Sequence, residues 1–137
     1  MDQPGAGYRE IQHTADWQLE VWAPDLPGLF EQAARGMAAL AGIQLGEAAA
    51  PAQHLEFVAQ DAESLLVKFL GELLYLQEQH GLGCERFDLA VSEGHLTAEL
   101  AMRPVIALEK QIKAVTYHNL AIQPTPRGLE ARIVFDV

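Results

Sequence analysis

Apolar and polar residues alternate with a period of two along two short segments near the start of the chain. Residues 8–12 and 18–23 fit this pattern, and in the second segment apolar residues occupy every other position from Leu19 to Ala23. Such alternation predicts short strands with one buried face. The motif "HTAD", residues 13–16, lies between the two predicted strands and contains a histidine and a carboxylate. This motif is either a simple turn or a functional site.

Two later segments repeat their apolar residues at helical spacing. The first helix is expected to follow the N-cap Asp25, to carry Pro27 in its first turn and to stop at Gly42. Asp, Pro and Gly are typical of these positions, because they cap free N–H groups, tolerate a missing donor and adopt a left-handed backbone. A second and more apolar helix should run from the cap Asp61 to "HGLG" at residues 80–83. Both helices are predicted to be amphipathic.

The rest of the chain reads mostly as strands. Five are expected from alternation and from the turn residues between them: 54–59, 86–93, 95–102, 113–122 and 128–137. Gly94 is expected to form a hairpin turn, Pro104 to stop a strand, and residues 44–51 to form a surface connection. The prediction is one α+β domain over residues 1–137: a mostly antiparallel sheet of about six strands with two amphipathic helices packed on one face.

Composition limits the classes of function. The 137 residues are 50% hydrophobic and 20% charged, which is typical of a globular domain, and their formal net charge is −10. An acidic surface repels phosphate, so direct nucleic-acid binding is not expected. Cys84 is the single cysteine and is interpreted as a small core or strand-edge residue. Because one cysteine cannot form an intramolecular disulfide, a reducing compartment is expected. Without a signal-peptide pattern or an apolar run of membrane-spanning length, the chain is predicted to be cytoplasmic.

The final predicted strand, "GLEARIVFDV", places anionic groups side by side. Its odd-numbered residues from Leu129 onward share an apolar face, while Asp136 points to the other face and the carboxylate of Val137 follows. Hard divalent cations take oxygen ligands of this kind, and Asp16 would add another if it lies near the chain's end. The alternative is that Asp16 is a turn residue and Asp136 a solvated terminal group.

Other polar residues are equally open to two interpretations. His13 is either a hydrogen-bonded structural histidine or a ligand or acid–base group. In "KAVTYHN", Lys113 and Tyr117 would share one strand face and Thr116 and His118 the other, as a polar ladder or as part of a site. The sequence has no nucleophile elbow, glycine-rich phosphate loop or zinc-spaced Cys and His, so nothing points to an enzyme.

Three motifs carry a resemblance over essentially the whole chain. "YREIQHTAD" near the start, "KAVTYHNL" in the last quarter and "ARIVFDV" at the end resemble the archease family in the same order, and "LPGLFEQAARGMAAL" is similar to its first helix. The resemblance implies a small non-enzymatic cofactor of the tRNA-splicing RNA ligase, which joins 2′,3′-cyclic phosphate or 3′-phosphate ends to 5′-hydroxyl ends. It would promote guanylylation of the ligase's histidine and multiple turnover. GTP and manganese would belong to the ligase.

The resemblance also implies a divalent cation site, with calcium as the ion. Its ligands would be Asp16, Asp136 and Val137. Three further motif residues are candidates for contacting the ligase or its nucleotide: His13, Lys113 and His118.

Two departures from the family's pattern affect the surroundings of these residues. Trp17 and Gln18 stand where an aliphatic residue followed by a small one is more usual, and Asn119 stands where glycine is common. Neither departure removes an expected ligand. Two other functions stay open: a chaperone-like protein-binding module that uses apolar surface, and a metal-dependent hydrolase that uses Asp16 and Asp136 on a bound water.

Overall fold

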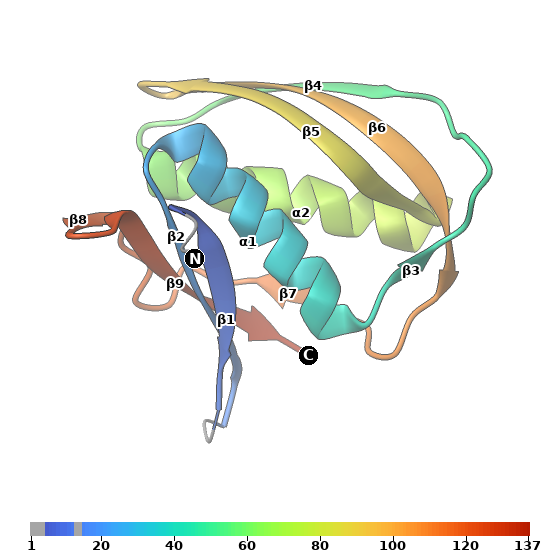
Figure 1. The fold of residues 1–137 in the computed structure, drawn as a ribbon, viewed down its shortest axis with the longest axis horizontal. Coiled ribbons are helices and arrows are strands. Elements are labelled where there is room, and N and C mark those ends of the chain that lie inside the picture. The colour runs from blue at the N-terminus through green and yellow to red at the C-terminus, as the bar shows by residue number, and fades with distance from the viewer. Residues whose placement is uncertain (1–4, 13–14) are drawn as a thin grey trace.

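A computed structural model of the chain describes residues 5–12 and 15–137. Within these residues, nine strands form two sheets, and two helices lie between the sheets (Figure 1). The α+β class and the mostly antiparallel pairing are confirmed. The expected single sheet of about six strands, with helices on one face, is instead divided into a five-stranded and a four-stranded sheet on opposite sides of the helices. No helix of the described ranges is long and apolar enough to cross a membrane.

The five-stranded sheet combines the two ends of the chain. Its strands are β1 (Gly7–Ile11), β2 (Trp17–Ala23), β7 (Ala114–Val115), β8 (Gln123–Thr125) and β9 (Gly128–Asp136). The order is β1-β2-β9-β7, β8 also pairs with β9, and every pair is antiparallel. The strands predicted at residues 8–12 and 18–23 are therefore confirmed, and the last strand lies beside one of the first.

The four-stranded sheet is built around one long strand. Its strands are β3 (Gln44–Leu45), β4 (Gln53–Val58), β5 (Leu82–Ser92) and β6 (His95–Ala107). The central strand β6 pairs antiparallel with the other three. Gly94 turns the β5–β6 hairpin with a φ of 69°, and a Cβ there would lie 2.7 Å from the Ala59 carbonyl oxygen. Both facts require glycine at this turn.

Two expectations for this sheet were wrong. Pro104 does not stop β6, which continues to Ala107. The backbone bonding avoids the donor that proline lacks: the Val105 N–H donates to the Gly81 oxygen, and the Pro104 oxygen accepts from the Gly46 N–H, both at 2.8 Å. The segment expected as a surface connection also contains the short strand β3, which pairs with β6.

The predicted helix ends are confirmed. In α1 (Leu26–Ala41), an Asp25 carboxylate oxygen accepts from the Gly28 N–H at 2.9 Å, and the C-cap Gly42 is left-handed. In α2 (Ala62–His80), an Asp61 carboxylate oxygen accepts from the Ser64 N–H at 2.7 Å, and the left-handed C-cap is Gly81. These ends follow from local chemistry, because each cap satisfies backbone groups within its own turn.

The helices connect the two sheets through one core. Phe30 of α1 and Phe69 of α2 stack with ring centroids 6.1 Å apart, and Phe69 meets Phe87 of β5 edge-on at 6.5 Å. On the other side α1 lies close to β2, because a Cβ at Gly36 would be 2.5 Å from a methyl carbon of Leu19. Both sheets therefore bury one face against the same helices and leave the other face to solvent.

Candidate functional site

The pairing of β2 with β9 brings the two expected aspartates together. Trp17 lies opposite Phe135 at the last pair of this ladder. Asp16 and Asp136 are the next residue on each strand, so the continued register sets them opposite one another, and both are exposed. Because alternate side chains point to opposite faces, both aspartates belong to the solvent side of the sheet. We call this end of the sheet the aspartate tip.

The donor chemistry of the aspartate tip suits a hard cation. Two like charges in opposite positions of a sheet destabilise it, and a bound calcium ion would relieve their repulsion with carboxylate oxygens as ligands. No three His, Cys, Asp or Glu side chains of the described ranges gather in a way that could hold a metal ion. The expected set contains only two such side chains, Asp16 and Asp136, with the last residue Val137 as the third donor.

The two residues next to the aspartates anchor the aspartate tip to the core. The side chains of Trp17 and Val137 are partly buried and pack against the hydrophobic core. The indole of Trp17 therefore points away from the solvent side on which the aspartates lie.

Lys113 is held beside the aspartate tip by its backbone. Its N–H donates to the Asp136 carbonyl oxygen at 2.8 Å, and the next residue, Ala114, pairs with Asp136 in the β7–β9 ladder. Its side chain lines a shallow groove together with Gly71 and Tyr75 of α2. The structure thus places this candidate contact residue next to the expected ligands.

The strand expected at residues 113–122 is wrong beyond its first residues. The Thr116 N–H and hydroxyl both donate to the Val134 carbonyl oxygen at 3.0 Å, and the chain then turns away from β9. At Asn119 the φ is 53°, a left-handed conformation that glycine adopts freely and asparagine tolerates. The predicted polar ladder is not formed.

The same turn helps to enclose a polar groove on the solvent side of the five-stranded sheet, which we call the outer groove. Its volume is about 440 Å³. The groove is lined by Gln18, Glu20, His118, Asn119, Ala121, Gln123, Thr125, Glu130, Ala131, Arg132 and Val134. His118, a candidate contact residue, therefore lies in the outer groove, whereas Lys113 lies on the opposite side of β7. His13 falls outside the described residues.

Ion pairs organise the wall of the outer groove next to β8. The Arg127 guanidinium bonds the Glu130 carboxylate through Nε at 2.9 Å and Nη2 at 3.0 Å, and lies 4.0 Å from the centroid of the Trp22 ring. These bonds, together with one from the Thr125 hydroxyl, lower the pKa of Glu130 to about 2. The side chains of this wall are therefore held in one arrangement by mutual contacts.

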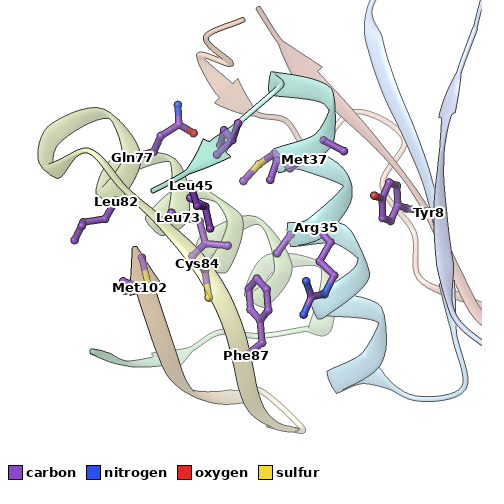
Figure 2. Close-up of a pocket in the computed structure, with 15 residues that line it drawn as sticks. Tyr8, Arg35, Met37, Leu45, Leu73, Gln77, Leu82, Cys84, Phe87 and Met102 are labelled. Atoms are coloured by element: carbon purple, nitrogen blue, oxygen red, sulfur yellow. The ribbon is translucent and has the colours of Figure 1, made fainter. Parts of the chain in front are cut away.

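A second pocket lies between α1, α2 and β5, and most of the residues that line it are apolar (Figure 2). Its volume is about 290 Å³, and none of the expected site residues that the structure describes lines it. Cys84 contributes to its wall, and burial raises the pKa of the thiol to about 12. The thiol donates to the Arg86 carbonyl oxygen at 3.1 Å. These properties agree with the prediction of a small structural cysteine on a strand, because a protonated thiol is a poor nucleophile.

Sequence reasoning did not single out Arg132 or Gln18 as site residues. The alternation along the last strand predicted that Arg132 shares a face with Asp136, and this pattern could have indicated Arg132 as a site residue. That the loop around His118 approaches the same face depends on the turn at Asn119, which the sequence pattern did not indicate.

The structure defines a class of small α+β proteins in which two sheets enclose two helices and two acidic residues meet at the end of one ladder. The family model for the Archease protein family (MTH1598/TM1083) matches residues 8–137. The chain belongs to the archease family, and the resemblance seen in its motifs is confirmed.

Curated relatives match over nearly their whole length. Protein archease of Methanosarcina acetivorans is 31% identical over 151 aligned positions that cover all of both chains. Protein archease of Archaeoglobus fulgidus is 30% identical over 135 positions, covering 95% of this chain and 98% of the relative.

Solved structures share the fold. A Thermotoga maritima protein described as an archease and possible chaperone has a TM-score of 0.69 at 23% identity, covering 100% of this chain and 98% of its own. Protein 1598 of Methanobacterium thermoautotrophicum has a TM-score of 0.68 at 22% identity, covering 96% and 99%. At these identities the likeness concerns the fold alone.

Proposed function

We propose that this chain is a non-enzymatic protein cofactor of an RNA ligase of the tRNA-splicing type, acting in the cytoplasm. The ligase would join 3′-phosphate or 2′,3′-cyclic phosphate ends to 5′-hydroxyl ends in tRNA splicing and RNA repair. The cofactor promotes GTP-dependent guanylylation of the ligase and allows multiple turnover. Membership of the archease family supports this proposal, and the meeting of Asp16 and Asp136 at the end of the β2–β9 ladder is the structural observation that carries it.

In this proposal the aspartate tip is the part of the chain that acts on the ligase. Asp16 and Asp136 hold a divalent cation, calcium by preference, together with Val137. Bound there, the cation supplies a positive charge that attracts further oxygen ligands. The chain's own residues position the tip: Trp17 and Val137 pack on the core, and the Lys113 N–H holds the Asp136 carbonyl oxygen at 2.8 Å.

Positioning is a sufficient physical role for such a cofactor. Correct alignment of reacting groups accounts for up to roughly 7–11 kcal/mol of a reaction barrier in favourable cases. The chain's net charge of −10 disfavours contact with RNA, so its target is the ligase itself. GTP and manganese remain components of the ligase reaction.

The test is covalent guanylylation of the cognate ligase with GTP and manganese, with and without substoichiometric amounts of this protein. The wild-type chain should accelerate labelling, and Asp16→Ala or Asp136→Ala should abolish the acceleration while the variants remain folded by circular dichroism. Asp88→Ala provides a matched control, because Asp88 is an exposed aspartate on the other sheet. Unchanged labelling with the wild-type chain would contradict the proposal.

A chaperone-like binding module is the second candidate, and it is favoured by the description of the Thermotoga maritima protein as a possible chaperone. Such a module would act through apolar surface and would not need the aspartate tip. Deletion of Asp136 and Val137 separates the two functions, because the module would keep its effect on the ligase. Turnover of a model phosphoester by the isolated chain, lost with either aspartate, would instead indicate a hydrolase.

A further inference from the structure

The outer groove begins two residue pairs inward from the aspartate tip. On the β2–β9 ladder Gln18 lies opposite Val134, and Glu20 lies opposite Arg132. Alternation places all four side chains on the same solvent side as the two aspartates. The aspartate tip and the outer groove are therefore neighbouring parts of one surface, and a partner that reaches the tip also faces the groove.

The two carboxylates in the outer groove are already neutralised. The Glu20 carboxylate lies 3.0 Å from Arg9 Nη2 and 3.4 Å from Arg127 Nη2. The Glu130 carboxylate is bound by the same Arg127 at 2.9 Å. Two arginines thus balance two glutamates, and neither carboxylate needs a further cation.

Arg132 takes no part in these ion pairs. It is exposed, lines the groove, and forms no ion pair within the described part of the chain. Its neighbour across the ladder, Glu20, is occupied by the other two arginines. Counted together with Arg9 and Arg127, which bind the two glutamates from outside the lining, the charged side chains at the outer groove carry one excess positive charge, in a chain whose net charge is −10. A guanidinium in this position offers two parallel N–H donors to a single carboxylate.

We propose that the outer groove is the docking site for an acidic segment of the partner ligase, with one Asp or Glu carboxylate of that segment bound to Arg132. The inference rests on the proposed function and adds the chemistry of the partner surface. The amides of Gln18, Asn119 and Gln123 line the same groove and supply donors and acceptors for the backbone of such a segment. The segment provides binding, while the aspartate tip provides the effect on the ligase.

A nucleotide phosphate fits the outer groove less well than a carboxylate. Phosphate sites combine several cations with backbone N–H groups at the start of a helix or in a nest. The lining contains a single guanidinium near the carboxylates of Glu20 and Glu130, and none of its described residues lies in a helix. A single carboxylate matches the one available guanidinium.

The experiment compares Arg132→Glu with Arg86→Glu, which reverses the charge of an exposed arginine on the other sheet. Fluorescence anisotropy measures the affinity of labelled protein for the intact ligase, and guanylylation is titrated at two salt concentrations. Arg132→Glu should weaken binding and raise the half-activating concentration at least tenfold, with the maximal rate preserved at saturation. Arg86→Glu should stay within twofold of wild type, and Arg132→Lys should lie between wild type and Arg132→Glu. Added salt should weaken wild-type binding more than Arg132→Glu binding, since the variant has lost a charge pair.

The outcomes separate the two proposals. If wild type activates the ligase and Arg132→Glu binds equally well, the groove inference is overturned while the proposed function stands. A lower maximal rate at unchanged affinity would also overturn it, because Arg132 would then act with the aspartate tip. Binding of GTP by the isolated chain in equilibrium dialysis, lost in Arg132→Glu, would replace the acidic segment with a nucleotide. If wild type neither binds nor activates the ligase, both proposals fail.

Discussion

The two sheets have similar architecture but different solvent faces. On the four-stranded sheet carboxylates lie beside histidines: His54 of β4 lies opposite Glu99 of β6 and hydrogen bonds with it, and the Glu56 carboxylate lies 3.7 Å from His54 and 3.6 Å from His95. Asp88 of β5 lies opposite Glu99 on the other side of β6, so two acidic residues face each other here as well. On the five-stranded sheet, complementary pairs give way at the aspartate tip to two acidic residues in opposite positions.

The difference lies in where the facing carboxylates stand in their ladders. Both sheets bury one face against the same two helices, so neither needs its solvent face for a core. Asp88 and Glu99 face each other within the β5–β6 ladder, and His54 lies beside Glu99. Asp16 and Asp136 instead follow the last pair of the β2–β9 ladder, and carboxylate oxygens are the ligands that a hard cation prefers.

Phe69→Ala should have the largest effect, and it tests whether the two sheets form one cooperative unit. Phe69 of α2 is fully buried and contacts Phe30 of α1 and Phe87 of the four-stranded sheet, so its truncation should cost about 3–5 kcal/mol of unfolding free energy. Urea unfolding followed by far-ultraviolet circular dichroism and by tryptophan fluorescence checks this. The fluorescence reports on β2 alone, since both tryptophans, Trp17 and Trp22, lie in that strand.

The two probes should give coincident transitions in the wild type and in Phe69→Ala. Tyr75→Ala, on the exposed side of the same helix, is the control and should change stability by less than about 0.5 kcal/mol. Separate transitions would mean that the sheets unfold independently.

Glu130→Gln should give the next largest effect, and it is confined to acidic pH. The bonds from Arg127 hold the pKa of Glu130 at about 2 against an ordinary 4.5. Stability from a lowered pKa is present above the ordinary value and is lost as pH falls toward the folded value. The urea midpoint of wild type should therefore fall more steeply between pH 5 and pH 3 than that of Glu130→Gln. In Arg127→Ala the urea midpoint should fall with pH as gradually as in Glu130→Gln. If it falls as steeply as in wild type in either variant, the bonds from Arg127 do not cause the lowered pKa of Glu130.

Asp136→Asn tests the aspartate tip itself. Without added metal the unfolding free energy of the variant should stay within about 0.5 kcal/mol of the wild type, because Asp136 is exposed. In millimolar calcium chloride the wild type should melt at a higher temperature than in chelator, because a ligand of the folded state stabilises it, and the variant should not respond. Glu56→Gln on the other sheet should keep the response. If the melting temperature of the wild type is the same in calcium chloride and in chelator, the result would contradict a calcium site here.

His54→Gln should have the smallest effect, and it concerns the four-stranded sheet. The hydrogen bond with Glu99 raises the pKa of His54 above 6.5. Stability from a raised pKa is complete below the ordinary value and is lost as pH rises through the folded value. Wild type should therefore lose slightly more stability than His54→Gln between pH 6 and pH 8. The difference is small because the side chain is 54% exposed and screened by solvent. If the melting temperatures of wild type and His54→Gln change equally between pH 6 and pH 8, the histidine–carboxylate pair does not stabilise this sheet.

Predictions from local chemistry were confirmed, and those that depended on a distant partner were less successful. Asp25 and Asp61 cap their helices and Gly94 turns its hairpin, because each acts within a few residues of itself. The extent of β6 beyond Pro104 depends on bonds to Gly81 and Gly46, which lie far away in the sequence. The end of β7 depends on the turn at Asn119, and the strand-like pattern of residues 113–122 did not indicate this turn. The expected ligands Asp16, Asp136 and Val137 remain predictions, as do the contact roles of Lys113 and His118.

The sequence by itself determined the two helices, their ends, and the alternating faces of β2 and β9, including the shared face of Arg132 and Asp136. It also carried the family motifs. Only the tertiary structure decided that the strands divide into two sheets around the helices, that β2 lies beside β9, and that Asp16 and Asp136 both follow the last pair of that ladder. The physical reason is that periodicity and caps are properties of neighbouring residues. Strand partners, by contrast, are chosen by the packing of the whole core and leave no local mark in the sequence.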